Sequence, residues 1–204
     1  MRAPSSPHRR RSYTPVRRWQ PLTDVEWNAL LPYVLVQNRP GRPLRDARRR
    51  MDAIFWTAAA GSPWRGLPPR FGKPDTVSRH FRRLSDAGLW ERLLRALSRA
   101  DAPPALLAVE HWICAACRRV GCRRDLRIIT LARRLGFLSA LRAPPHMLPD
   151  VDLSERVHRW MLPVLQDARE RGARAIPPGF LRECRRWLTL CGGRQRIPRF
   201  LQPA

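Results

Sequence analysis

The sequence predicts an all-α protein, with a helix-turn-helix-like N-terminal domain followed by a helical C-terminal extension. Apolar residues recur at intervals of three and four along much of the chain, which is the period of an amphipathic helix. No segment sustains the alternation of apolar and polar residues that is typical of a strand. Hydrophobic residues make up 44% of the 204 residues, so the chain has enough apolar material for a core.

Composition divides the chain into three regions. Residues 1–20 combine arginines with prolines and serines and have few apolar side chains, so we expect a disordered basic arm. Residues 21–100 carry the helix-turn-helix-like domain. Pro103-Pro104 marks a boundary, and residues 101–204 form the helical extension.

Four helices are expected in the N-terminal domain. Thr23 and Glu26 have the spacing of a capping box, which predicts a helix beginning at Thr23. A second helix is expected over about 46–60, a third from 75 or 76 to near Gly88, and a fourth over 89–100. The second helix has a predicted buried stripe of Met51, Ile54, Phe55 and Ala58, and the third one of Val77, Phe81 and Leu84.

The extension shows helical patterns around 105–120, 125–141, 153–171 and 179–191. Asp152 and Glu155 have the spacing of another capping box, and Gly192 suits the position just past a helix end. Three roles are open for this half of the chain: a second DNA contact, a dimerisation element or a drifted remnant.

Charge is the strongest compositional signal. The formal net charge is +24, and the isoelectric point is near 11.8. Such an excess favours binding to polyanions, and arginine, which supplies every basic residue except Lys73, makes bidentate contacts to phosphate and guanine. No apolar run is long enough for a membrane span, and no apolar leader is present, so we expect a cytoplasmic protein with reduced thiols.

Several short motifs follow one another over residues 22–97. They are Leu22-Thr23-Asp24 with Trp27, Gly41-Arg42-Pro43, Asp46 with Arg48-Arg49, Gly61-Ser62-Pro63-Trp64-Arg65-Gly66-Leu67-Pro68, Phe71-Gly72, Thr76-Val77, Phe81-Arg82-Arg83, and Gly88-Leu89-Trp90 with Leu93. In this order they resemble the N-terminal domain of the insertion sequence five group of bacterial transposases. The resemblance implies a helix-turn-helix module that recognises the DNA ends of a mobile element, in the bacterial cytoplasm and associated with the nucleoid.

We expect the third helix to be the recognition helix, the one that contacts the bases. In such modules the second helix of the pair enters the major groove with its N-terminal residues leading. We expect Arg79 and Arg82 to contact base edges, and Arg83 and Lys73 to contact phosphate. The full set of expected DNA contacts is Arg42, Arg45, Arg48, Arg49, Arg65, Lys73, Thr76, Ser78, Arg79, Arg82 and Arg83.

The same resemblance implies a catalytic domain further along the chain, and its motifs are not found. Those transposases resemble metal-dependent nucleases with three carboxylates on a ribonuclease-H-like sheet. Glu110 follows an apolar run at the position of the first aspartate, but no second aspartate or distal glutamate has the right context. We therefore expect no catalytic residues, no metal and no cofactor. Two alternatives are an accessory chain working with a separately encoded catalytic chain, and a DNA-binding regulator; RNA binding is a weaker one.

His111, Cys114, Cys117 and Cys122 could in principle supply four zinc ligands. Structural zinc sites more often use two separated pairs, and on one helix these residues cannot all reach one ion. We expect plain thiols here.

Overall fold

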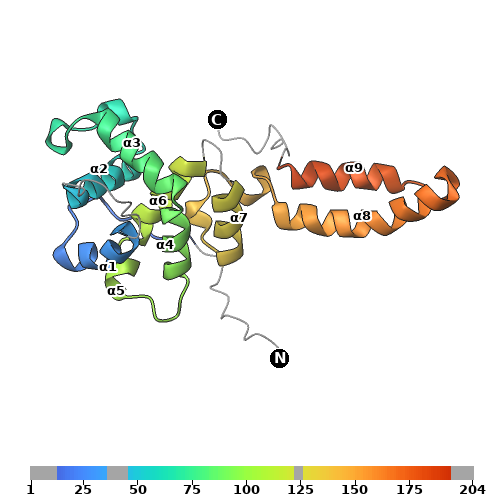
Figure 1. Ribbon diagram of the computed structural model, residues 1–204, viewed down its shortest axis with the longest axis horizontal. Coiled ribbons are helices and arrows are strands. Elements are labelled where there is room, and N and C mark those ends of the chain that lie inside the picture. Colours follow the sequence, from blue (N-terminus) through green and yellow to red (C-terminus); the bar gives the residue numbers. More distant parts are fainter. Residues whose placement is uncertain (1–12, 36–45, 122–125, 194–204) are drawn as a thin grey trace. The chain divides into compact units, whose positions relative to one another are not determined.

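The computed structural model describes residues 13–35, 46–121 and 126–193, and every regular element in these ranges is helical. Nine α-helices and five short 3-10 helices follow one another in the described ranges, with no strand between them (Figure 1). The prediction of an all-α protein is confirmed. The chain divides into two compact units, residues 1–142 and 143–204.

The first two helices follow the sequence pattern. α1 (Asp24–Leu35) begins with the predicted capping box: the Thr23 N–H donates to Glu26 Oε2 (2.9 Å), and the Glu26 N–H donates to Thr23 Oγ1 (3.2 Å). α2 (Ala47–Ala59) buries every residue of its predicted apolar stripe: Met51, Ile54, Phe55 and Ala58.

The connections on either side of α3 (Pro74–Asp86) differ in length. Residues 60–73 join α2 to α3 and contain two 3-10 helices, Trp64–Gly66 and Pro69–Phe71. This is longer than the turn of about three or four residues in a helix-turn-helix pair. Only Ala87 and Gly88 join α3 to α4 (Leu89–Leu97), and Gly88 has a φ of 72°, which glycine adopts without strain.

The centre of the first unit is α6 (Glu110–Gly121), which follows the short α5 (Pro104–Ala108). Six successive α6 residues, 112–117, are at most 1% exposed. A helix that is apolar around its whole circumference is buried on all sides. Accordingly α6 packs against α2, α4, α7 (Leu126–Leu135) and the 3-10 turn Leu138–Ala140.

The first unit therefore extends past the boundary that the sequence predicts. The segment after Pro103-Pro104 supplies the buried α6, and α5 packs on α1. Residues 101–142 complete the core that residues 21–100 begin, because α2 and α4 bury their apolar faces against α6. Two prolines can open a helix as well as separate domains, and Pro104 here is the first residue of α5.

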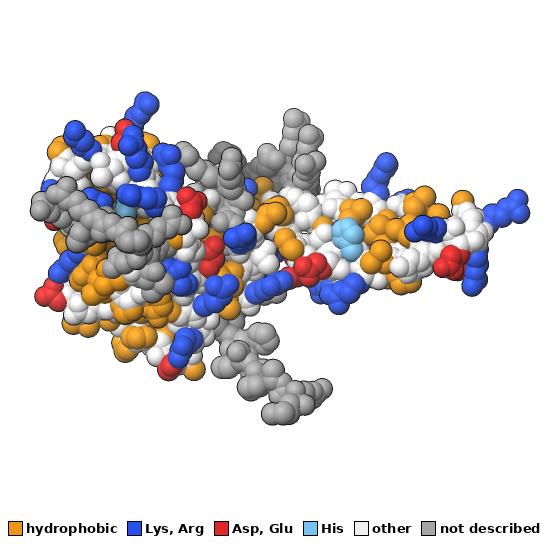
Figure 2. All heavy atoms as spheres, in the orientation of Figure 1, with side chains coloured by type: hydrophobic (Ala, Val, Ile, Leu, Met, Phe, Trp, Pro, Cys, Tyr) orange, Lys and Arg blue, Asp and Glu red, His pale blue; other side chains and the backbone are white. Residues whose placement is uncertain are grey.

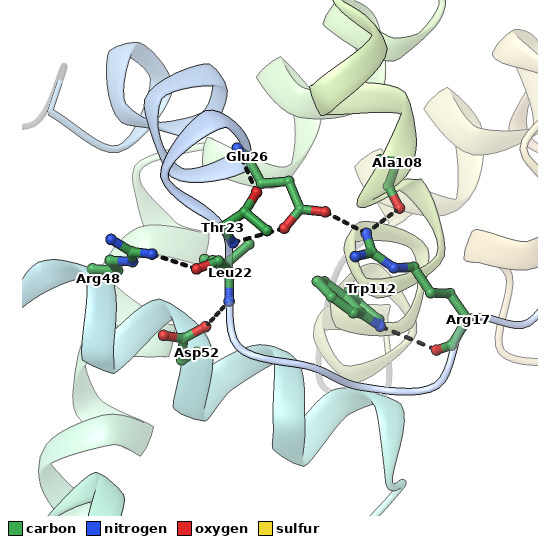
Figure 3. A network of polar contacts seen from close by, with 8 residues as sticks. All are labelled: Arg17, Leu22, Thr23, Glu26, Arg48, Asp52, Ala108 and Trp112. Carbon is green, nitrogen blue, oxygen red and sulfur yellow. Dashed lines mark hydrogen bonds and ion pairs between the residues drawn. The ribbon is translucent and has the colours of Figure 1, made fainter.

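Residues 13–21, which we call the N-terminal strap, lie across this core without regular secondary structure (Figure 3). The Arg17 guanidinium lies over the Trp112 ring, 4.1 Å from its centroid. It also pairs with Glu26 Oε1 (2.6 Å) and donates to the Ala108 carbonyl (2.7 Å). In return, the Trp112 indole N–H donates to the Arg17 carbonyl (3.1 Å). The contacts of one arginine thus join the strap to α1, α5 and α6.

Both ends of the strap are also tied down. The Thr14 N–H donates to Ser139 Oγ (2.7 Å), and Thr14 Oγ1 donates to Glu110 Oε1 (2.6 Å). Directly after the other end, the Leu22 N–H donates to Asp52 Oδ1 (2.8 Å). The prediction of a disordered arm is therefore wrong for residues 13–20, because polar partners far along the chain order them. Residues 1–12 lie outside the described residues.

The second unit contains a helical hairpin of α8 (Val151–Arg171) and α9 (Phe180–Cys191), connected through the 3-10 turn Ala173–Ala175. Asp150 caps α8: its Oδ1 accepts from the Leu153 N–H (2.9 Å). The prediction of a capping box at Asp152 and Glu155 is wrong, because the capping residue is Asp150, two positions earlier. The Asp150 N–H also donates to the Cys191 carbonyl (2.8 Å), which closes the base of the hairpin.

A glycine ends α9, one residue later than predicted. Gly192 is right-handed, whereas Gly193 has a φ of 67° and takes the left-handed position just past the helix. A Cβ atom on Gly193 would overlap the backbone carbonyl of Leu148. Both the backbone angle and this close approach therefore require glycine at position 193.

Candidate nucleic-acid interface

α3 is an amphipathic helix whose inner face is held by aromatic packing. Pro74 occupies its first turn, where a missing N–H costs nothing. Val77, Phe81 and Leu84 are buried, as predicted. The Phe81 ring packs between Trp64 and Trp90, with ring centroids 5.3 and 5.5 Å away.

A short hydrogen-bond chain fixes α3 against α4. The Trp90 indole N–H donates to Ser85 Oγ (2.8 Å), and the Ser85 hydroxyl donates to the Phe81 carbonyl (2.8 Å). Trp90 is fully buried, so its indole N–H needs such a partner. These contacts, with the tight turn at Gly88, leave α3 little freedom to rotate about its own axis.

The outer face of α3 is basic and exposed. Thr76, Arg79, Arg82 and Arg83 line an open depression of about 490 Å³. Arg79 and Arg83 make no ion pair or hydrogen bond with any described residue, and Arg82 makes only a 3.3 Å bond to Ser78 Oγ. Figure 2 shows Lys and Arg side chains gathered over the region of α3, at the upper left. The face can accept an anionic ligand without breaking an internal ion pair.

Two further predicted residues lie exposed near this face. Lys73 is the residue before the first turn of α3, and Arg65 lies in the 3-10 turn that packs against α3. Neither has an ion pair among the described residues. The structure thus brings Lys73, Thr76, Arg79, Arg82 and Arg83 onto one helix, with Arg65 beside it. Arg42 and Arg45 lie outside the described residues.

Arg48 and Arg49, at the start of α2, are engaged within the protein. Arg48 pairs with Asp24 and donates to the Leu22 carbonyl. Arg49 donates through Nε to the Arg70 carbonyl (2.7 Å). Cations near a helix N-terminus cost stability, and these acceptors offset that cost. The prediction that both arginines are DNA contacts is therefore not supported, because their guanidinium groups already have acceptors.

Ser78 and His80 lie on the buried side of α3, each 5% exposed. The prediction of Ser78 as a DNA contact is wrong, because it shares the inward arc with Phe81, one turn further along. His80 has no hydrogen-bond partner at Nε2 among the described residues. Burial, with smaller contributions from Arg50 and Arg83, lowers the pKa of His80 to about 4. The imidazole is thus neutral at physiological pH, directly behind the basic face.

The described cysteines and helices form neither a metal site nor a membrane span. Among the described residues, no group of three or more His, Cys, Asp or Glu side chains is arranged to hold a metal ion. Cys114 and Cys117 are buried, and Cys122 lies outside the described residues. None of the helices in the described ranges combines the length and the hydropathy that crossing a membrane requires.

Comparison with known proteins points to one family. Residues 22–94 match the family described as "Putative transposase of IS4/5 family (DUF4096)". A stretch of 79 residues is 32% identical to "Uncharacterized protein y4sN" of Sinorhizobium fredii (strain NBRC 101917 / NGR234). This alignment covers 38% of the present chain and 63% of that relative, so the chain spans less than two thirds of the relative's length. No solved structure matches the chain significantly.

The family match starts directly after the strap and ends within α4, so it includes all of α3 with both its packed face and its basic face. The helices after α4 lie beyond it. The resemblance that the sequence motifs predict is therefore confirmed: over residues 22–94, the chain is similar to the IS4/5 transposase family.

Proposed function

We propose that the chain binds double-stranded DNA through the outer face of α3. The proposal rests on a difference between two groups of arginines: one group has acceptors within the protein, and the other has no acidic partner among the described residues. Several arginines of the first unit donate to carbonyl or carboxylate oxygens of the protein itself: Arg17, Arg48, Arg49, Arg92, Arg118 and Arg119. Arg79, Arg82 and Arg83 are exposed and have no acidic partner among the described residues. These three cations are therefore free to pair with phosphate.

The shape of the site favours duplex DNA. The major groove admits one α-helix, and arginine is the most common side chain that reads guanine there. In the α3–α4 pair, α4 is buried at six of its nine positions, so α3 is the helix that can enter a groove. We assign Arg79 and Arg82 to base edges, and Lys73, Arg83 and Arg65 to phosphates. Because His80, on the buried side of α3, is neutral, the positive charge of the outer face comes from these exposed side chains.

We further propose that these 204 residues do not form a catalytic core. The catalytic domain that the family resemblance implies is built on a sheet carrying three carboxylates. The described residues after α4 contain helices and no strand, and Glu110 is 5% exposed and accepts from Thr14. For transposition, we propose that the chain works with a separately encoded catalytic chain; the alternative role is that of a DNA-binding regulator. In either role we expect it to work on the DNA of the bacterial cytoplasm.

Duplex affinity measured against salt concentration tests the DNA-binding proposal. With a labelled duplex and fluorescence anisotropy, we expect log K to fall linearly with log salt, with a slope of about −0.9 for each phosphate contact. Replacing Lys73 and Arg83 by alanine should make the slope shallower by about 2, because two phosphate contacts are lost. The matched control replaces Arg159 and Arg182, two exposed arginines of the second unit, and should leave the slope unchanged.

Two results would contradict the proposal. One is the absence of duplex binding at low salt. The other is a slope that responds to the control pair as strongly as to Lys73 and Arg83, which would mean that the contacts are spread over the whole basic surface.

A further inference from the structure

Arg50 differs from the two arginines that precede it in the first turn of α2. Arg48 pairs with Asp24, and Arg49 donates to the Arg70 carbonyl. The Arg50 side chain is half-buried and makes no ion pair or hydrogen bond with any described residue. A cation in the first turn of a helix costs stability, and no acceptor in the described part of the chain offsets that cost here. An anion from outside the chain would offset it.

Arg50 lies beside the flank of α3 that carries His80. α2 packs against α3, and the charge of Arg50, like that of Arg83, lowers the pKa of the His80 imidazole. Helical geometry places Thr76 and Arg83 on the same flank, because both are rotated by roughly 40–60° from His80 in the same sense. Both are exposed. Two helices thus contribute to one group of side chains, Arg50, Thr76, His80 and Arg83, which we call the α2–α3 cluster.

The acidic side chains of these helices do not neutralise the α2–α3 cluster. Four acidic residues belong to α2, its N-cap and α3: Asp46, Asp52, Asp75 and Asp86. None of the four forms an ion pair with Arg50 or Arg83. The two on α3 are rotated by roughly 120–140° from His80, and the one within α2 lies on the opposite side of that helix from Arg50. The cluster therefore holds two cations without an acidic partner in the described ranges, beside a neutral imidazole.

Two guanidinium groups and a hydroxyl are a suitable set of donors for a phosphate group. Arginine binds phosphate oxygens through two parallel hydrogen bonds, and threonine is a common donor to the phosphates of DNA. The Thr76 hydroxyl has no hydrogen-bond partner among the described residues. In helix-turn-helix complexes the helix that precedes the recognition helix crosses the DNA backbone, and in this chain that helix is α2. The cluster thus lies where a backbone phosphate would pass if α3 entered the major groove.

We propose that Arg50 and Arg83 hold one phosphate group between α2 and α3, with the Thr76 hydroxyl as a hydrogen-bond donor. In the DNA complex this group is a backbone phosphate beside the groove that α3 enters, and in that form the inference rests on the proposed function. A phosphate held from two helices fixes the orientation of α3 on the duplex, because contacts to phosphate set the register of the protein.

The salt dependence of duplex binding tests whether the two arginines share one phosphate. We expect Arg50→Ala to make the slope of log K against log salt shallower by about 1, because one phosphate contact is lost. Arg50→Ala with Arg83→Ala should give the same slope as Arg50→Ala alone, because the contact is already lost. Arg95→Ala is the matched control, since Arg95 is exposed on α4, and it should keep the wild-type slope.

Two results of this experiment would overturn the inference. One is a wild-type slope for Arg50→Ala. The other is a slope shallower by about 2 for the double variant, because Arg50 and Arg83 would then contact separate phosphates. Circular dichroism shows whether each variant is folded. If Arg50→Ala lowers helicity, Arg50→Gln provides the same comparison, since glutamine keeps part of the side-chain stem and removes the charge.

Inorganic phosphate separates the cluster from the DNA-binding proposal. The ring signals of His80 and His158 are followed by NMR in the full chain at neutral pH, with phosphate added and with chloride at equal ionic strength. We expect phosphate to shift the His80 signals saturably and to leave those of His158, which is exposed on α8, unchanged. Arg50→Gln should abolish the shift.

The two experiments together show which proposal fails. A chain that binds no duplex but shows the phosphate-dependent shift of His80 retains the phosphate site, and the proposed function is then wrong. A chain that binds duplex through α3, with a wild-type slope for Arg50→Gln and no response of His80 to phosphate, has no such site. The inference is then wrong and the proposed function stands.

Discussion

Replacing Trp112 by alanine is expected to lower the free energy of unfolding of the first unit by about 3–5 kcal/mol. Trp112 is fully buried in α6 and packs on Phe55, with ring centroids 5.9 Å apart. It also receives the Arg17 guanidinium on its ring and donates its indole N–H to the strap. The substitution therefore leaves a cavity and also removes the two contacts that Trp112 makes with Arg17 of the strap. Urea denaturation followed by circular dichroism measures the loss.

Trp187→Ala is the control for this experiment. Trp187 is 40% exposed on α9, so its removal should cost about 1 kcal/mol or less. A cost equally small for Trp112→Ala would show that α6 is not part of the core that α2 and α4 form. Residues 101–142 would then be a separate extension, as the sequence alone predicts.

The protein is expected to lose stability as the pH falls from 6.5 to 4, and His80 should account for roughly 3 kcal/mol of that loss. Its pKa in the folded chain is about 4, against 6.5 for a free imidazole, mainly because the side chain is buried. Between these two pH values the unfolded chain binds a proton at His80 and the folded chain does not. The contribution of His80 is therefore complete above pH 6.5 and is lost as the pH falls through the folded pKa.

His80→Gln isolates this contribution, because glutamine does not titrate. The variant should have a shallower dependence of unfolding free energy on pH between 4 and 6.5 than the wild type. His158→Gln is the matched control for the substitution itself, since His158 is exposed on α8. If His80→Gln also kept the wild-type slope, His80 would be accessible to protons in the folded chain, and α3 would not be packed as described.

The sequence predicts those parts of the fold that depend on neighbouring residues. The capping box of Thr23 and Glu26 joins residues three positions apart, and the buried stripes of α2 and α3 follow from helical periodicity alone. The strap depends instead on Glu110, Trp112 and Ser139, whose polar atoms come from positions about a hundred residues away. Composition shows a basic, proline-rich segment there and contains no information about those partners.

The candidate site divides in the same way. The exposure of Arg79, Arg82 and Arg83 follows from the helical phase of Val77 and Phe81, so the sequence predicts it. The contacts of Arg48 and Arg49 cannot be predicted from helical phase, because their acceptors, the carbonyls of Leu22 and Arg70, are brought close only by the tertiary fold. A count of arginines therefore overestimates how many are available for DNA. The structure separates the arginines that donate to oxygens of the protein from the exposed arginines of α3.

If α3 is the DNA-binding element, removing its two base-contacting arginines should weaken binding, and the duplex Kd of Arg79→Ala with Arg82→Ala at physiological salt tests this. The comparison is Arg159→Ala with Arg182→Ala, which removes the same charge from the second unit. Each arginine contact to a base is worth about 1–3 kcal/mol, so the loss of two contacts should weaken binding by about thirtyfold or more. The control pair should change the Kd by less than about threefold, since neither arginine belongs to the proposed interface and salt screens exposed charges. Equal losses for the two pairs would contradict a role of α3 as the DNA-binding element, because the binding would then come from diffuse arginine charge.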